Sequence, residues 1–166
     1  GQYAAWAFKV NYAGELSGTY RVLETIPDGM ELAYIRIKWV GGQNFDTINS
    51  KENPALETSG WTKKTISAAT DNGGKSKTTT YYVKGNQALI ELGDFTAGKE
   101  RDDYSVDVQV VCRVTDPKVL LGGETKTFTN QVTLQTIDGQ DISTATSPAE
   151  ITPKKLEKTY TPTNPK

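Results

Sequence analysis

Apolar and polar residues alternate along much of this chain with a period of two, the pattern of half-buried β-strands. Turn sequences such as Asp71-Asn72-Gly73-Gly74 and Asp138-Gly139 separate the alternating segments, and long helical periodicity is absent. We therefore predict an all-β fold, an immunoglobulin-like β-sandwich of about nine strands. The strands are expected at residues 4–12, 18–26, 31–40, 65–69, 77–84, 87–92, 103–115, 124–136 and 154–160.

Two stretches lack the alternation. Residues 43–63 are interpreted as a long loop with one helical turn at most, and residues 143–148 as a small, polar connection. We expect two units, a sandwich over residues 1–152 and a lysine-bearing strand with its tail over residues 153–166. The residues predicted to point into the core are Trp6, Phe8, Val10, Val106, Val108, Val110, Phe128 and Val132.

Composition excludes several classes of function. The net charge of -1 gives no reason to expect nucleic acid or an anionic membrane as partner, and the apolar runs are too short to span a bilayer. The chain has no histidine and one cysteine, which excludes intrachain disulfides, zinc clusters and histidine-based triads, so no cofactor is expected. That cysteine, Cys112, lies on the apolar face of strand 103–115 and is interpreted as a core residue rather than a reactive thiol.

Three polar side chains share a strand face with apolar neighbours, where a charged or amide group is unusual. Taken singly, each has an ordinary explanation: a strand end that reaches water, an amide bonded to backbone, or a lysine on an edge strand. The three are Glu24 beside Tyr20 and Val22, Asn130 between Phe128 and Val132, and Lys158 between Leu156 and Tyr160.

Together, a lysine, a carboxyl and an amide in an apolar core form a reactive set. Burial disfavours charge, so the lysine becomes a neutral nucleophile and the carboxyl stays protonated. The carboxyl can then polarise the amide, the amine attacks it, and ammonia leaves. We predict a bond between Lys158 and Asn130, assisted by Glu24, with neither cofactor nor enzymatic turnover. Lys155 and Gln131 have the wrong parity, and Lys154 precedes the apolar pair of its strand.

At these residues the chain resembles a family, the immunoglobulin-like, isopeptide-forming domains of Gram-positive surface adhesins and pilins, of the collagen-adhesin A-region type. The resemblance covers nearly the whole chain, and it implies the same fold and the same self-formed crosslink. The family's acid at this place is usually aspartate, whereas here it is Glu24. The motifs that carry the resemblance are Trp6-x-Phe8-x-Val10-Asn11, Glu24-Thr25-Ile26-Pro27-x-Gly29, Ile90-Glu91-Leu92-Gly93, the strand from Tyr104 to Val114, Phe128-Thr129-Asn130 and Lys158-Thr159-Tyr160.

The order of the motifs departs from that family. Its lysine strand precedes its tryptophan strand, whereas Lys158 here follows everything else. Joining the end of the sequence to its start places Lys158 14 residues before Trp6, close to the family's spacing. We interpret the sequence as starting and ending at a different point of the fold from the family's domains. It is then either a segment of a tandem array of such domains or a circular permutant of one. Its last strand then docks in its own sandwich, which tethering favours, or in a neighbouring copy.

The leading functional hypothesis is a structural stalk or adhesin domain of a bacterial surface protein or pilus. Its expected place is outside the cell on the cell wall, beside neighbouring domains of the same protein, with no insertion into the membrane. The alternative is a module that binds a host extracellular matrix protein or peptide, with Trp61 in loop 43–63 as its anchor unless that ring packs on the sandwich. A glycosidase using Asp102 and Asp103 is disfavoured, because adjacent strand residues point to opposite faces. The segment Asp138–Asp141 is interpreted as a turn rather than a calcium site.

Overall fold

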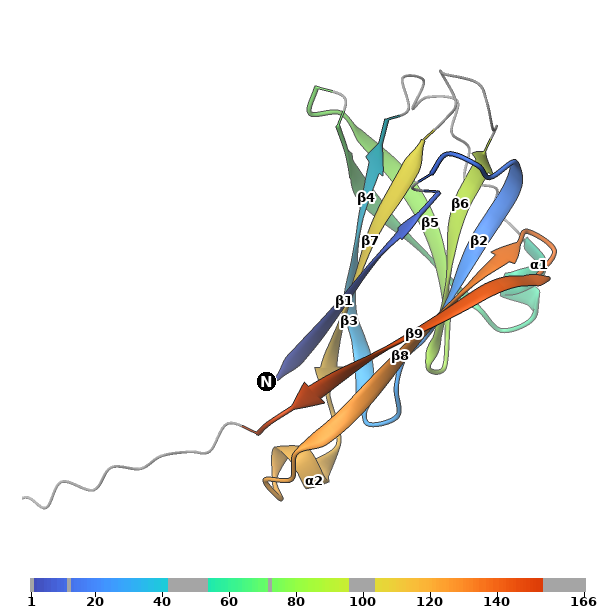
Figure 1. Cartoon of the computed structure of the whole chain (residues 1–166). Coiled ribbons are helices and arrows are strands. Elements are labelled where there is room, and N and C mark those ends of the chain that lie inside the picture. The colour runs from blue at the N-terminus through green and yellow to red at the C-terminus, as the bar shows by residue number, and fades with distance from the viewer. Residues whose placement is uncertain (1, 12, 42–53, 72, 96–103, 154–166) are drawn as a thin grey trace, which may run out of the picture.

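A computed structural model describes residues 2–11, 13–41, 54–71, 73–95 and 104–153 of the chain. Strands dominate this part of the chain, and only two short helices interrupt them, so the all-β prediction is confirmed (Figure 1). The elements are β1 (Tyr3–Val10), β2 (Gly18–Thr25), β3 (Met30–Val40), α1 (Pro54–Thr58), β4 (Thr62–Thr70), β5 (Ser76–Lys84), β6 (Gln87–Phe95), β7 (Ser105–Val114), α2 (Pro117–Leu120), β8 (Lys126–Thr136) and β9 (Asp141–Ile151).

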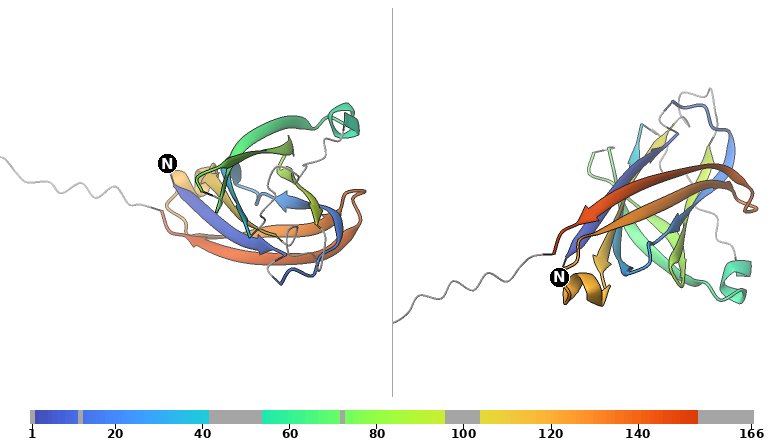
Figure 2. Two further views of the ribbon diagram at one scale, coloured as in Figure 1. Left: turned by 90° about the horizontal axis from the view of Figure 1, so that it is seen from above. Right: turned by 60° about the horizontal axis from the view of Figure 1, so that its bottom comes forward.

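The nine strands form one continuous sheet in the order β1-β7-β3-β4-β5-β6-β2-β8-β9. Neighbouring strands are antiparallel except for a short parallel contact between β3 and β4. The sheet curls on itself, so its two halves face each other as the two layers of a sandwich (Figure 2). The curl also brings the two edge strands, β1 and β9, to the same side of the molecule (Figure 1).

The core lies between the two halves of the sheet and is built by the predicted alternation. Six of the eight predicted core residues are buried, and the other two, Phe8 and Val132, are partly buried and pack against that core. The central strands contribute the largest side chains, including Trp39 and Phe95, which are 0% and 1% exposed. The sequence pattern therefore assigned the inward faces of β1, β7 and β8 correctly.

Strand β9 corrects the expectation for residues 143–148, which were interpreted as a connection. They lie within a strand of eleven residues that pairs with β8 alone, with Asn130 opposite Ser147. Most of β9 is exposed, so burial imposes no apolar alternation on it and the period-two signal is missing. Pro148 fits because an edge strand has backbone N–H groups that need no partner.

The two helices are short. Helix α1 is the helical turn expected within residues 43–63, whereas α2 was not predicted. The Asp116 side chain caps α2 by accepting a hydrogen bond from the Lys118 N–H, and Pro117 occupies its first turn. An aspartate cap followed by proline is an ordinary helix start signal, so α2 was detectable in the sequence.

Candidate functional site

Two of the three predicted site residues touch each other in the core. Glu24 lies on β2 and Asn130 on the adjacent strand β8, and the Asn130 Nδ2 group donates a hydrogen bond to Glu24 Oε1. Glu24 is directly opposite Val132, so Asn130 is its diagonal neighbour on the same face. Diagonal partners are separated by roughly 7–8 Å between Cα atoms, a distance that needs a long side chain. The extra methylene of glutamate relative to aspartate helps Glu24 to span it.

The pair is shielded from solvent and incompletely satisfied. Glu24 is 0% exposed and Asn130 is 3% exposed. The second carboxyl oxygen of Glu24, Oε2, has no hydrogen-bond partner. Burial raises the pKa of Glu24 from 4.5 to about 7, and the hydrogen bond from Asn130 offsets only part of that rise. A large fraction of Glu24 is therefore protonated near neutral pH and able to donate a hydrogen bond.

The third residue, Lys158, lies outside the described residues, as do Lys154 and Lys155. Every lysine in the described part of the chain is exposed or half-buried, so none of them occupies the core beside Glu24 and Asn130. The described residues thus contain the acid and the amide of the predicted set, but not its lysine.

Cys112 lies across the sandwich from this pair, on β7. It is fully buried, in register with Ala4 of β1 and Leu32 of β3, as expected for a core residue. Burial, and secondarily the charge of Glu24, raise the pKa of the thiol to about 12. A thiol with such a pKa carries almost no thiolate at neutral pH, so it is a poor nucleophile.

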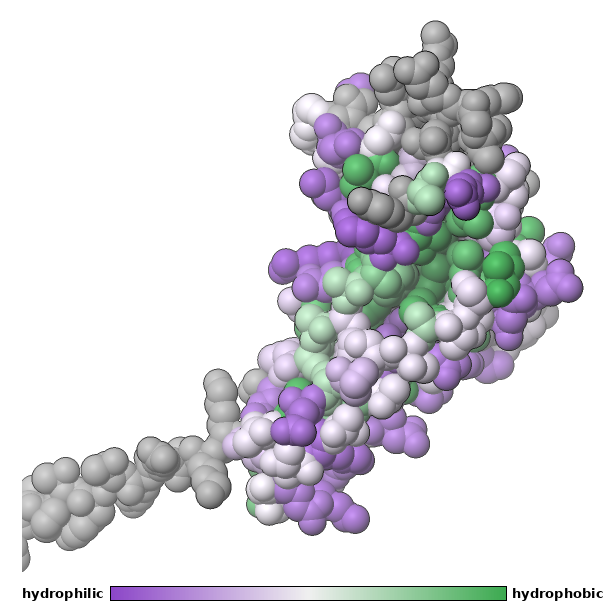
Figure 3. Space-filling model, in the orientation of Figure 1, coloured by the Kyte–Doolittle hydropathy of each residue, from purple (hydrophilic) through white to green (hydrophobic). Residues whose placement is uncertain are grey.

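The edge strands β1 and β9 meet at one end and separate at the other (Figure 1). At the closed end, the indole Nε1 of Trp6 donates a 3.1 Å hydrogen bond to the Ser147 carbonyl, and Gln2 Nε2 donates a 2.9 Å bond to the Thr152 carbonyl. At the open end lies a groove of about 340 Å³, and hydrophobic side chains are visible in the hollow between the two strands (Figure 3). We call it the edge groove; it is lined mainly by Phe8, Val10, Leu16, Val132, Leu134 and Ala145.

A second buried acid, Glu91 on β6, was not predicted as a site residue. It is 0% exposed, neither carboxylate oxygen has a hydrogen-bond partner, and burial raises its pKa to about 7 despite the opposing charge of Arg21. Its parity is opposite to that of Ile90, so it lies on the outer face of the sheet, away from Glu24. The alternation along β6 predicts that Glu91 faces solvent. The burial of its neighbours Leu89 and Tyr82 shows instead that this outer face of the sheet is covered.

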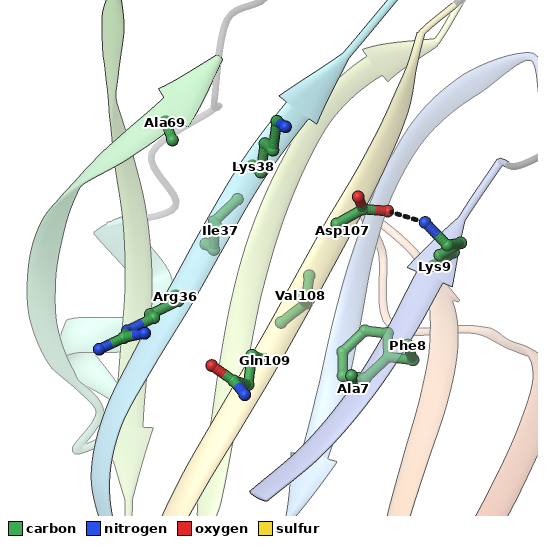
Figure 4. A pocket seen from close by; sticks show the side chains of 10 residues that line it. All are labelled: Ala7, Phe8, Lys9, Arg36, Ile37, Lys38, Ala69, Asp107, Val108 and Gln109. Carbon is green, nitrogen blue, oxygen red and sulfur yellow. Dashed lines mark hydrogen bonds and ion pairs between the residues drawn. The ribbon is translucent and has the colours of Figure 1, made fainter. Parts of the chain in front are cut away.

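The candidate ligand anchor Trp61 is half-buried and directly precedes β4. Its backbone N–H donates to the Leu56 carbonyl of α1, so the residue is held in the turn between helix and strand. A separate groove of about 680 Å³ lies on β1, β7, β3 and β4, where Ala7 and Ala69 are flanked by longer side chains such as Arg36 (Figure 4). Trp61 does not line this groove.

Asp102 and Asp103 lie outside the described residues. Asp138-Gly139 forms the turn between β8 and β9, with the Gly139 N–H donating to the Thr136 carbonyl at 2.9 Å. Within the described ranges, no three acidic, cysteine or histidine side chains gather as a metal site would require. None of the helices described there has the length and apolar character needed to cross a bilayer.

Comparison with known proteins gives distant structural similarity only. No family model and no curated protein sequence matches the chain. The collagen-binding subdomain ACE19 of the Enterococcus faecalis surface protein ACE aligns over 90% of this chain and 87% of its own, with 13% identity and a TM-score of 0.47. The collagen-binding domain of a Staphylococcus aureus adhesin aligns over the same shares, with 13% identity and a TM-score of 0.43. A non-cellulosomal cohesin of Archaeoglobus fulgidus aligns over 88% and 79%, with 16% identity and a TM-score of 0.37.

Proposed function

We propose that this chain is a structural domain of a bacterial cell-surface protein or pilus, held together by one isopeptide bond between Lys158 and Asn130. The observation that carries the proposal is the buried contact between Glu24 and Asn130, with Glu24 Oε2 unpartnered. An acid and an amide enclosed by a hydrophobic core are costly to bury, and a purely structural core would favour apolar residues at both positions. The resemblance of the surrounding motifs to adhesin and pilin domains supports an extracellular, cell-wall location.

The chemistry needs only side chains. A lysine brought into this core loses its proton, because burial disfavours the ammonium form. The side-chain amide of Asn130 first rotates so that its carbonyl oxygen, in place of its nitrogen, faces Glu24. Protonated Glu24 then donates a hydrogen bond to that oxygen, and the amide carbon becomes more electrophilic. The Lys158 Nζ atom bonds to Asn130 Cγ, the Cγ–Nδ2 bond breaks, and the nitrogen leaves as ammonia after proton transfer by way of Glu24. The bond forms once, so the domain is no enzyme in the sense of turnover.

Intact-protein mass tests this proposal. We expect the wild-type protein to weigh about 17 Da less per bond than its sequence, because each condensation releases one ammonia molecule. Glu24→Ala and Asn130→Ala should fold, as judged by far-ultraviolet circular dichroism, and keep the full sequence mass. Gln131→Ala is the matched control, because Gln131 is exposed and points away from Glu24. A full mass deficit in Glu24→Ala would show that another acid does this work.

A second candidate function is binding of a host extracellular matrix protein or peptide. The observation that favours it is the groove across β1, β7, β3 and β4, in which the cationic side chains of Arg36 and Lys38 on β3 lie between the short side chains of Ala69 and Ala7 (Figure 4). Such a surface suits an extended chain with acidic residues.

Surface plasmon resonance against immobilised collagen and fibrinogen tests this second function. Ala7→Arg, which fills the groove, should then abolish binding, whereas Trp61→Ala should leave it unchanged, because Trp61 lies outside the groove. Binding that survives Ala7→Arg but is lost in Trp61→Ala would instead place the ligand on the α1–β4 turn.

A further inference from the structure

The edge groove lies beside the Glu24–Asn130 pair: Val22, which shares a face of β2 with Glu24, is among its lining residues. Val132 and Leu134 of β8 form part of its floor, and Asn130 follows on the same face of the same strand. Asn130 is in register with Ser147, whose carbonyl marks the point where Trp6 closes the gap between β1 and β9. Asn130 is therefore the next residue along this face of β8 beyond the floor of the groove. Its two walls are edge strands, and the described residues form no backbone ladder between them.

The groove and the exit of the chain lie at opposite ends of the molecule. Strand β9 runs from the open end, at Ser143, toward the closed end, where Gln2 binds the Thr152 carbonyl. The described chain leaves at Pro153, beside the start of β1 (Figure 1). A segment that continues in this direction moves away from its own groove and toward the open end of a molecule placed beyond it.

On the basis of the proposed function, we propose that the edge groove receives residues 154–160 of a second copy of this chain. The inserted segment is a strand antiparallel to β1 and parallel to β9, and it delivers Lys158 of the second copy to Asn130. Copies are thus joined head to tail. The contact is heterologous and does not close on itself, so it continues into a linear fibre.

The length and pattern of the segment fit the groove. With Lys158 level with Asn130, Leu156 faces Val132 and Ala145, and Lys154 reaches the mouth, since four residues of strand span about 13 Å. Glu15 lines that mouth and offers a carboxylate to the Lys154 ammonium group. The Lys158 side chain is thereby placed against an apolar surface, next to the polar side chains of Glu24 and Asn130.

The chain's own segment cannot adopt this arrangement. Lys154 would have to lie near Ser143, about 30 Å back along β9 from Thr152, and only Pro153 connects Thr152 to Lys154. Its own segment could enter only as a hairpin with β9, in the opposite direction. That route starts at the closed end and has to displace the Gln2–Thr152 and Trp6–Ser147 hydrogen bonds.

The linking step balances in the same way between two chains as within one. The neutral Lys158 amine of the second copy attacks Asn130 Cγ, an N–C bond forms, the Cγ–Nδ2 bond breaks, and ammonia leaves. No oxidant or reductant is consumed, and each link lowers the summed mass of the two chains by about 17 Da.

Complementary full-length variants test this inference. Lys158→Arg has an intact acceptor but no nucleophile, since a guanidinium stays protonated. Asn130→Ala has the lysine but no acceptor, and Glu24→Gln is a second donor of nearly unchanged shape in case Asn130→Ala fails to fold. Each variant alone should stay monomeric on a denaturing gel. Mixing Lys158→Arg with either donor should give one covalent heterodimer of the summed mass minus about 17 Da. Lys155→Arg, the same substitution at opposite parity, should behave like wild type and form a ladder of oligomers.

The outcomes separate this inference from the proposed function. A ladder in wild type and a heterodimer in the mixture support strand donation between copies. A wild-type monomer with the mass deficit and no heterodimer in the mixture would overturn the inference while leaving the isopeptide bond in place. Full sequence mass in wild type, together with no heterodimer, would overturn both.

Discussion

At the residue scale, the decisive feature is a carboxyl that the core holds away from water. Sequence parity was enough to find Glu24 and Asn130, because both share a strand face with apolar residues that had to be buried. Their contact was not predictable, since it depends on β2 and β8 being neighbours in the sheet. The sequence did not predict that Glu91 is buried, because Glu91 lies on the face that alternation assigns to solvent, and tertiary packing covers that face.

Burial of Glu24 should make stability depend on pH. Its pKa is 4.5 when exposed and about 7 in the fold, so the folded state holds this proton more tightly than the unfolded state. The stabilising effect is complete below about pH 4.5 and is lost as pH rises to about 7, by up to about 3 kcal/mol. We therefore compare Lys158→Arg with Lys158→Arg/Glu24→Gln, since neither protein can form the crosslink.

Urea denaturation between pH 4 and 8 gives the required free energies. Removing the ionisable group should make the double variant gain stability relative to Lys158→Arg as pH rises from 4.5 to 7, and the difference should then level off. Glu91, also raised to about 7, remains in both proteins and cancels in the comparison. A difference that does not change with pH would mean that Glu24 is not held protonated by the fold.

At the scale of elements, the two edge strands determine where a further strand can be added to the sheet. Alternation predicted β1 because Trp6 and Val10 are buried, but it missed β9, whose exposed face carries no apolar period. The sheet order, which makes β1 and β9 the two edges, could not be deduced from strand positions alone. An added strand in the edge groove would pair with backbone groups on both sides.

Hydrogen exchange should report that added strand directly. In the monomeric Lys158→Arg protein at low concentration, backbone amides of residues 7–10 and 143–146 that point into the gap should exchange rapidly, because they have no ladder partner. In crosslinked wild-type oligomers the same amides should be strongly protected, while those of β7 stay protected in both proteins. Equal exchange at these positions in the two samples would rule out insertion of a strand at this edge.

At the scale of the whole molecule, a covalent link between distant segments should raise stability. A crosslink keeps the inserted strand at high effective concentration beside its groove, and we take roughly 2–4 kcal/mol, the value for the analogous disulfide, as the size of the effect. For a domain of this size that corresponds to a Tm about 4–16 °C higher than in Lys158→Arg. Lys155→Arg should keep the wild-type Tm. Differential scanning calorimetry of the three proteins measures the shift, and identical Tm values would leave the crosslink without a stabilising role.

Tandem mass spectrometry of a trypsin digest can show whether Lys158 and Asn130 are joined. Cleavage releases residues 127–154, which contain Asn130, and trypsin cannot cut after a lysine whose amine is bonded, so residues 156–166 stay whole. We predict one branched peptide that combines these two segments at their summed mass minus about 17 Da, with fragment ions that place the link at Lys158 and Asn130. Recovery of linear peptide 127–154 together with free Leu156-Glu157-Lys158, and no branched species, would contradict it.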